Sequence, residues 1–311
     1  MKFTRTLLAI SILSAAQLTT AQAKKPDAFV QQLLEKQYPH NEKALKVFNE
    51  TTEGEKAKRC YFKEDKELSN EGDGMYGYCM DFIGEKIVDT TQDKRRYVFF
   101  SGDSLMTCRG CSGLDSLFIF TSTDGKDWSL LSHKETDGGG SWGKGSGAVK
   151  WQETGPGVWG VITEGSFSQG GATQGITQIL HDDGKEIRET VIPTLAETTG
   201  MADCDDKEYL KIAEKSQAEC YANETALEAT VKVRKDLPAV GNTYPLQVTI
   251  DGYDGLKSVG KGKKAKTQPI KAYKNQKFLF PYNPDKHEYM MPADYPKSLR
   301  FLDDMENTGN Q

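Results

Sequence analysis

Long apolar runs and an excess of positive charge are both absent from most of this 311-residue sequence. After residue 23, no stretch approaches the roughly 20 apolar residues that a membrane-spanning helix needs. The chain has 40 basic and 45 acidic residues, which give a formal net charge of −5. This balance argues against a dedicated nucleic-acid-binding protein. The sequence therefore predicts no transmembrane segment after residue 23 and no nucleic-acid partner.

Cofactor-binding motifs are scarce as well. A single Cys-x-x-Cys occurs, and no second cysteine or histidine pair at metal-ligand spacing accompanies it. The glycine-rich run at 143–147 lacks the spacing, the preceding strand and the following helix of a dinucleotide-binding fingerprint. We therefore expect neither a metal nor an organic cofactor.

The first 23 residues have the three regions of a secretory signal peptide. Lys2 and Arg5 precede an apolar run at 7–13, and an Ala-Gln-Ala site follows at 21–23. The pattern predicts cleavage near Lys24, where no cysteine is present to accept a lipid. We expect a periplasmic or secreted protein that is exported across the inner membrane of a bacterium.

All six cysteines follow the predicted signal peptide, and an even number in an exported chain indicates three disulfides. Several connectivities are possible, and we favour pairing between sequence neighbours. The expected pairs are Cys60 with Cys79, Cys108 with Cys111, and Cys204 with Cys220.

Cys108 and Cys111 have the spacing of a redox dithiol. Such a site needs a helix whose N-terminus lowers the thiol pKa, whereas an apolar run typical of a strand follows here at 117–120. A structural disulfide is therefore the favoured interpretation of this pair.

Hydrophobic periodicity predicts a mainly β protein of the α+β type, with antiparallel sheets in a sandwich-like or barrel-like arrangement. A short helical arm is predicted at the N-terminus, with helices at 26–38 and 41–48. Runs of aromatic and β-branched residues predict strands at 76–83, 96–101, 117–122, 149–152, 158–163 and 176–180.

The clearest alternation of apolar and polar residues lies at 227–234 and 246–251, which predicts a hairpin with one buried face. A further hairpin is expected to join 277–282 with 287–291. A helix is possible at 205–216. It conflicts with the Cys204–Cys220 pair unless the helix stops near Glu214 and the chain turns back.

These patterns divide the chain into four parts. We predict a signal peptide at 1–23, a helical arm at 24–55, a glycine- and tryptophan-rich β domain at 56–200, and a C-terminal β-hairpin region with a lysine-rich loop at 201–311.

Glycine and tryptophan are concentrated in one stretch. Residues 138–175 contain 13 of the 30 glycines, together with Trp142, Trp151 and Trp159. Tryptophans flanked by glycine can present flat faces to a sugar ring or an extended peptide, and they can equally fill the core between two sheets. We take these three tryptophans as candidate binding residues for a glycan, a peptide or a partner protein.

Eight lysines and no acidic residue occur at 257–277. Such a block can contact phosphate or carboxylate groups of an anionic surface, or it can form a solvated hairpin loop. The candidate residues for this contact are Lys257, Lys261, Lys263, Lys264 and Lys266.

The sequence Gly-Asp-Ser-Leu at 102–105 follows an apolar strand and resembles the nucleophile block of the GDSL family of esterases and lipases. The resemblance implies that Ser104 is a nucleophile activated by a histidine placed three residues after an aspartate. That second element is missing, because His287 follows Asp285 by two residues and no other histidine has an aspartate at this spacing. The sequence favours a binding protein without catalytic activity, and a serine esterase that uses Ser104 is the alternative.

Overall fold

The computed structural model describes residues 25–51, 57–66, 75–108, 110–169, 171–198, 204, 206–212, 216–259 and 266–301. The predicted signal peptide and the lysines at 261, 263 and 264 lie outside these residues. Within the described ranges, no helix combines the length and the apolar character needed to cross a membrane.

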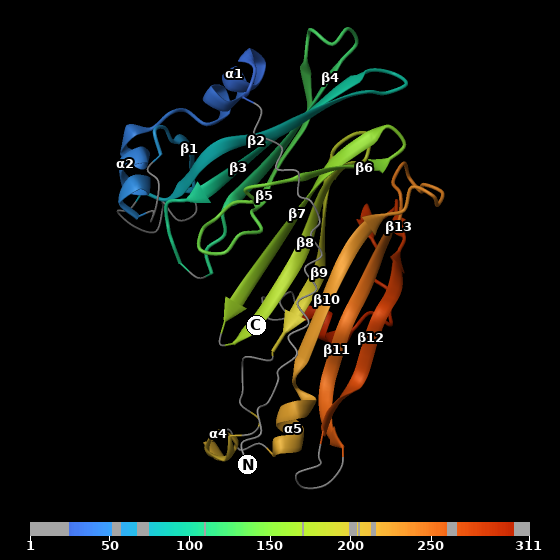
Figure 1. Ribbon diagram of the computed structural model, residues 1–311. Coiled ribbons are helices and arrows are strands. Elements are labelled where there is room, and N and C mark those ends of the chain that lie inside the picture. The colour runs from blue at the N-terminus through green and yellow to red at the C-terminus, as the bar shows by residue number, and fades with distance from the viewer. Residues whose placement is uncertain are drawn as a thin grey trace, which may run out of the picture.

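Two antiparallel sheets make up most of the described chain, and within each sheet the spatial order of the strands follows their order in the sequence (Figure 1). The five-stranded sheet contains β1 (Tyr61–Glu64), β2 (Gly77–Asp89), β3 (Lys94–Ser104), β4 (Leu114–Ser122) and β5 (Ser129–Asp137). The seven-stranded sheet contains β6 (Lys150–Gly155), β7 (Val158–Gln169), β8 (Ala172–Asp182), β9 (Ile187–Glu197), β10 (Thr225–Val233), β11 (Leu246–Val259) and β12 (Lys266–Phe280). A two-stranded sheet of β13 (Tyr282–Asn283) and β14 (Glu288–Tyr289) follows. The predicted fold class is confirmed.

The predicted N-terminal helical arm is also confirmed, as α1 (Ala28–Gln37) and α2 (Glu42–Thr51). Asp27 begins α1 because its carboxylate accepts a hydrogen bond from the backbone N–H of Val30 at 2.9 Å. Two short helices, α4 (Lys207–Ile212) and α5 (Gln217–Ala222), lie between β9 and β10, and the 3₁₀ helix η2 (Lys297–Leu299) follows β14.

All three predicted disulfides are present: Cys60–Cys79, Cys108–Cys111 and Cys204–Cys220. The third pair is compatible with helical structure because the helix is interrupted. The helix α4 ends at Ile212, and the hydroxyl of Ser216 caps α5, so that the two cysteine Cα atoms approach to 5.6 Å.

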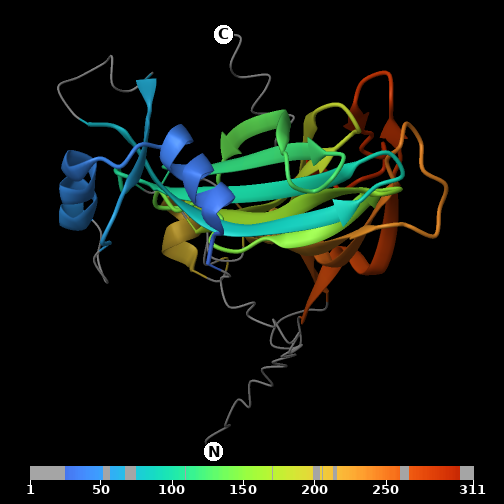
Figure 2. The same ribbon diagram turned by 90° about the horizontal axis from the view of Figure 1, so that it is seen from above.

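The two large sheets are stacked, and both faces of the five-stranded sheet are covered (Figure 2). The helix α1 packs on its outer face, against residues such as Val98 of β3 and Phe118 of β4. On the inner face, Tyr97 and Leu117 pack against residues of the other sheet such as Val161. Because the central parts of β3 and β4 are buried on both faces, each contains an unbroken apolar run, at 97–100 and 117–120, rather than an alternating pattern.

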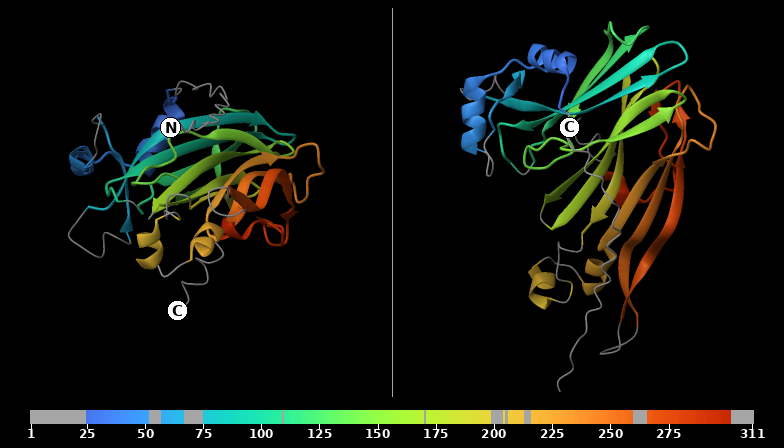
Figure 3. Two further views of the ribbon diagram at one scale, coloured as in Figure 1. Left: turned by 60° about the horizontal axis from the view of Figure 1, so that its bottom comes forward. Right: turned by 45° about the horizontal axis from the view of Figure 1, so that its top comes forward.

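The seven-stranded sheet curls into a half-barrel (Figure 3). Just before β11, the backbone N–H of Tyr244 donates to the carbonyl of Thr154 in β6 at 2.8 Å, which links two distant parts of the sheet. A separate core lies between the strands of this sheet and the C-terminal segment, where Leu227 and Val248 belong to the same buried cluster as Tyr295 and Leu299.

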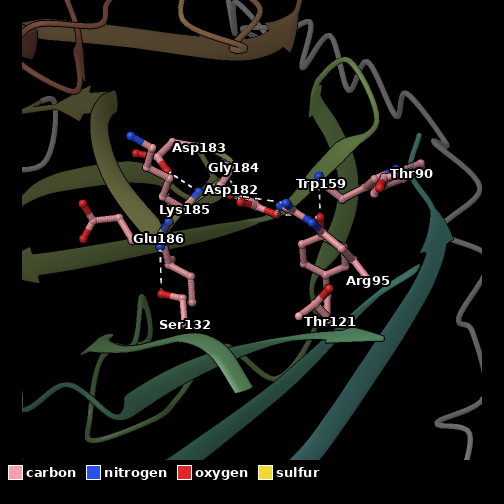
Figure 4. A network of polar contacts seen from close by, with 12 residues as sticks. Thr90, Arg95, Thr121, Ser132, Trp159, Asp182, Asp183, Gly184, Lys185 and Glu186 are labelled. Atoms are coloured by element: carbon pink, nitrogen blue, oxygen red, sulfur yellow. Dashed lines mark hydrogen bonds and ion pairs between the residues drawn. The ribbon is translucent and has the colours of Figure 1, made fainter. Parts of the chain in front are cut away.

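A buried ion pair joins the two large sheets (Figure 4). The carboxylate of Asp182, on β8, is fully buried and accepts hydrogen bonds from the guanidinium of Arg95 and, at 2.9 Å, from the hydroxyl of Tyr97, both on β3. Its other oxygen accepts from the N–H of Gly184 at 2.7 Å. The Tyr97 hydroxyl in turn accepts from the N–H of Trp159 at 3.2 Å. These partners offset the cost of burying the carboxylate, which would be very high for an unpaired charge.

Three strands were not predicted: β1, β5 and β9. The strand β5 carries charged residues and a burial pattern without regular alternation, because it lies at the edge of its sheet. The strand β9 contains Pro193 beside a bulge in its pairing with β8. The bulge interrupts the alternation of side chains, and a proline in a sequence usually indicates a loop or an edge strand.

The hairpin of β10 and β11 is confirmed, whereas the hairpin expected at 277–282 and 287–291 is shorter than predicted. Residues 277–280 belong to β12 and pair with β11, which offers a much longer partner than 287–291. The turn between β13 and β14 nevertheless forms as expected, because the Asn283 side chain accepts hydrogen bonds from the N–H groups of Asp285 and Lys286.

The described lysines of the lysine-rich region lie on strands rather than in a loop. Lys257 is on β11, and Lys266 begins β12, the exposed edge strand of the seven-stranded sheet. Long pairing between β11 and β12 explains the difference. Lysines and a proline, Pro269, on such an edge discourage pairing with another chain. Contact with an anionic surface stays a prediction.

His181 is a fully buried residue of β8, and neither of its ring nitrogens has a hydrogen-bond partner among the described residues. The rings of Tyr282 and Tyr289 lie edge-on to it, with centroids at 5.7 and 5.6 Å. Burial lowers the pKa of His181 from 6.5 to about 4. The folded protein therefore keeps this side chain neutral at pH values where the unfolded chain protonates it.

We expect His181 to make the protein less stable as the pH falls from 6.5 to about 4. Only the unfolded state takes up the proton in this window, so the contribution to the free energy of unfolding is complete above it and is lost progressively within it. The loss approaches about 3 kcal/mol. Urea unfolding across the window, with the native protein and His181→Leu, measures this effect. An identical pH dependence in the two proteins would contradict it.

Candidate functional site

Residues 138–149 form a crossing segment that carries the chain from β5 to β6. Among the described elements, it is the only direct covalent connection between the two large sheets. Its glycines let backbone pack on backbone: a Cβ on Gly165 of β7 would lie 2.0 Å from the carbonyl oxygen of Gly139. Likewise, a Cβ on Gly113 would lie 2.2 Å from the nitrogen of Gly145. The glycine-rich composition is therefore explained by close packing of this segment.

The ends of β3 and β4 hold the crossing segment in place. The carboxylate of Asp103 accepts from the ammonium of Lys144 at 2.7 Å and from the N–H of Gly145 at 3.0 Å. Gly143 is bound on both sides, because its carbonyl accepts from the N–H of Ser104 and its N–H donates to the carbonyl of Cys111, each at 2.7 Å. The turn around residue 143 is thus fixed by backbone hydrogen bonds.

A buried carboxyl group supports the far end of the same segment. Asp115, on β4, is fully buried, and one of its oxygens accepts from the hydroxyl of Ser101 at 2.6 Å and from the N–H of Ser146 at 3.1 Å. Burial raises the pKa of this carboxyl, although the two hydrogen bonds act in the opposite direction. Asp115 thus ties the crossing segment to the interior of the five-stranded sheet.

The GDSL-like block is part of this support. Its aspartate and serine are Asp103 and Ser104, and the Ser104 hydroxyl accepts from the N–H of Met106 at 3.0 Å. The four histidines, all within the described residues, contact other groups: His40 the carbonyl of Cys60, His133 the hydroxyl of Ser116, His181 the two tyrosine rings, and His287 the carboxylate of Asp183. None of these contacts could activate Ser104.

The structure places the three candidate tryptophans in two different settings. Trp151 and Trp159 lie together on the β6–β7 hairpin and are half-buried against the core between the sheets. The ring of Trp151 packs edge-on to that of Tyr97, and the ammonium of Lys86 lies 4.3 Å from the ring centroid of Trp159. Trp142 is apart from them, in the crossing segment, and its side chain is 51% exposed.

The backbone of Trp142 is in the left-handed region, with φ at 62°. For a bulky residue this conformation is unfavourable by about 1 to 2 kcal/mol, and glycine or asparagine is the usual occupant. The hydrogen bonds of Gly143 keep the turn in this shape. An aromatic ring held exposed at an unfavourable backbone position favours a binding role over a packing role.

A cleft of about 540 Å³ lies beside the crossing segment. It opens where β9 and β10 diverge, since these neighbouring strands pair at three positions only. We call it the glycine cleft. Its accessible polar lining comes from Ser141 and Lys144 of the crossing segment, Glu164 and Ser166 of β7, and Glu228 and Thr230 of β10, and the buried Thr177 and Thr194 also line it.

The glycine cleft offers several unused hydrogen-bonding groups. The carboxylates of Glu164 and Glu228 have no hydrogen-bond or ion-pair partner among the described residues, and both side chains are exposed. Trp142, which is exposed, directly follows Ser141 of the cleft lining in the chain. Sequence reasoning missed Glu164 and Glu228, because only the pairing of distant strands brings them together.

A larger cleft, of about 690 Å³, lies between the helical arm and β1. Two of its charged or titratable side chains, those of His40 and Lys63, have partners within the protein. His40 contacts the carbonyl of Cys60 and the carboxylate of Glu42, and Lys63 forms an ion pair with Glu135 at 2.7 Å. We take the glycine cleft as the candidate ligand site, because the exposed Trp142 directly follows one of its lining residues.

No protein-family model, curated protein or solved structure matches this chain. Within the described ranges, no three metal-ligating side chains lie close enough together to hold a metal ion. The functional conclusion therefore rests on the chemistry of the site.

We expect Gly165→Ala to destabilise the protein by about 1 to 3 kcal/mol or more, because the new methyl group would overlap the backbone of the crossing segment. Gly147→Ala is the matched control. It lies in the same glycine-rich stretch, and a Cβ there would meet nothing within 4 Å. Chemical denaturation of the two variants measures the difference, and equal stabilities would show that the close approach is not needed.

The three tryptophans should respond differently to replacement by alanine. Trp151→Ala and Trp159→Ala should each lower the free energy of unfolding by about 2 to 4 kcal/mol, because both rings contribute to the core between the sheets. Trp142→Ala should change it by about 0.5 kcal/mol or less, because the ring is largely exposed. Thermal and urea unfolding of the three variants test this, and a large loss at Trp142 would place that ring in the core.

Proposed function

We propose that this protein is an exported binding protein without catalytic activity, and that it binds a glycan in the glycine cleft against the ring of Trp142. One observation carries the proposal: the exposed Trp142, at a left-handed backbone position, directly follows Ser141 of the cleft lining. A peptide or a partner protein as the ligand is the alternative.

The chemistry of the site supports a sugar ligand. A pyranose ring has an apolar face that stacks on an aromatic ring, and its hydroxyl groups donate hydrogen bonds at the ring edge. Trp142 supplies the aromatic face. Glu164 and Glu228 supply carboxylate acceptors, and Ser141 and Thr230 supply hydroxyl groups. Few polar groups around an aromatic platform are sufficient to orient such a ligand.

The disulfides support the exported location in this proposal. All six cysteines are paired and none is free. Disulfides of this number form and persist in oxidising compartments such as the bacterial periplasm or the extracellular space. The signal-peptide pattern at 1–23 points to the same location.

The test is calorimetric titration of the purified mature protein with short neutral, acidic and amino-sugar oligosaccharides. Trp142→Gly should weaken binding of the oligosaccharide that binds best by about tenfold, as expected for loss of a central aromatic contact, without lowering stability. Glu164→Gln and Glu228→Gln should each weaken it several-fold. Glu50→Gln, a change on the exposed surface of α2, is the control and should leave binding unchanged.

A panel of extended peptides is titrated in parallel. Peptide binding that depends on Trp142, together with no oligosaccharide binding, would establish the alternative. If neither class of ligand binds in a Trp142-dependent manner, the proposed role of the glycine cleft is wrong.

A further inference from the structure

The Cys108–Cys111 disulfide differs from the other two in exposure and in loop size. Cys108 is exposed and Cys111 is half-buried, whereas Cys60, Cys204 and Cys220 are buried. The pair is separated by 3 positions in the sequence, against 19 and 16 for the other pairs. A very short loop loses little chain entropy when it is closed, so this disulfide stabilises the fold least. Exposed disulfides of this kind are the ones open to exchange.

The same disulfide loop is bonded directly to the turn that displays Trp142. The N–H of Cys111 donates to the carbonyl of Cys108 at 3.1 Å, and the carbonyl of Cys111 accepts from the N–H of Gly143 at 2.7 Å. The neighbouring Gly113 N–H donates to the carbonyl of Lys144 at 3.0 Å. The crosslink thus fixes the backbone that holds Trp142 in its left-handed conformation.

We infer that the Cys108–Cys111 disulfide is a reversible thiol–disulfide exchange site, and that its oxidation state controls how Trp142 is presented. The pair is a target of exchange rather than a catalyst of it. No helix begins at Cys111 to stabilise a thiolate, because the chain continues into β4 at Leu114. The partner that acts on it is a dithiol reductant, either a small molecule or a protein.

The exchange consumes one dithiol and yields one disulfide. A thiolate of the reductant attacks the sulfur of Cys108, the exposed residue of the pair, the bond between the two protein sulfurs breaks, and Cys111 leaves as a thiolate that takes up a proton. The second thiol of the reductant then loses its proton and attacks the mixed disulfide. Cys108 is released as a thiolate, which is protonated, and the reductant becomes a cyclic or intramolecular disulfide. The reverse sequence restores the crosslink.

Reduction removes the covalent link between Cys108 and Cys111. The Cys111 carbonyl is then held by the local backbone alone. Of the two hydrogen bonds that fix Gly143, and with it the left-handed backbone of Trp142, the one to this carbonyl is weakened. Because a left-handed tryptophan is unfavourable, the turn relaxes when its support weakens. The effect on ligand affinity rests on the proposed function, whereas the exchange and the relaxation of Trp142 do not.

The first experiment equilibrates the native protein with mixtures of reduced and oxidised dithiothreitol. Free thiols are trapped with N-ethylmaleimide, and mass spectrometry quantifies each cysteine pair. For each pair, the midpoint is the ratio of reduced to oxidised dithiothreitol at which half of the pair is reduced. The midpoint of Cys108–Cys111 should be lower than the midpoints of the other two pairs by about tenfold or more. Reduction of the three pairs together, or of Cys60–Cys79 first, would overturn the proposal.

The second experiment follows Trp142 by acrylamide quenching of its fluorescence, with the Trp142→Phe protein subtracted. Selective reduction should raise the quenching of this component by up to about twofold, because the ring is 51% exposed while the turn is intact. The double variant Cys108→Ser/Cys111→Ser should show the same rise. Cys204→Ser/Cys220→Ser, which removes the disulfide at α4 and α5, is the matched control and should show none.

An unchanged Trp142 signal after confirmed reduction would overturn the coupling between the disulfide and the turn. If a serine variant fails to fold, selective reduction of the native protein gives the same readout. Neither measurement uses a ligand, so failure of the glycan proposal would leave both results unaffected.

Discussion

Close packing of backbone on backbone at the crossing segment is the constraint on which the candidate site depends. The chain must pass from one sheet to the other between β5 and β6, and it does so in contact with Gly113 and Gly165, where no side chain could fit. Asp103 and Asp115 then fix the segment with hydrogen bonds. A loop held this tightly can keep a tryptophan in a conformation that a mobile loop would abandon.

The glycine cleft has a separate cause, which lies in the seven-stranded sheet. The strands β9 and β10 are connected through α4 and α5 rather than by a tight turn, and they pair at three positions only. Beyond these positions the strands diverge, and the crossing segment lies beside the opening. The cleft thus combines two unrelated irregularities of the fold, the divergence of β9 and β10 and the glycine-rich crossing segment.

The features that could be predicted from the sequence are those encoded locally. The helix start at Asp27, the alternation in β10 and the spacing of neighbouring cysteines each depend on a few adjacent residues. The strands β5 and β9 escaped prediction because an edge position and Pro193 remove the alternation. The site was harder to predict. Trp142 lies in the crossing segment, whereas Trp151 and Trp159 lie on strands, although the three residues are close in sequence. Glu228 lines the cleft only because β10 pairs with β9.

The strict agreement between strand order and sequence order has a consequence for how this protein folds. Each strand in the two large sheets can be added to the one before it, so sheet growth needs few contacts between distant parts of the chain. Where the sheets dock, the Asp182–Arg95 ion pair and the crossing segment make contacts of long sequence separation. We therefore expect docking of the two meanders, rather than formation of either one, to be the slow step of folding. The N-terminal meander can form before the second half of the chain has been synthesised.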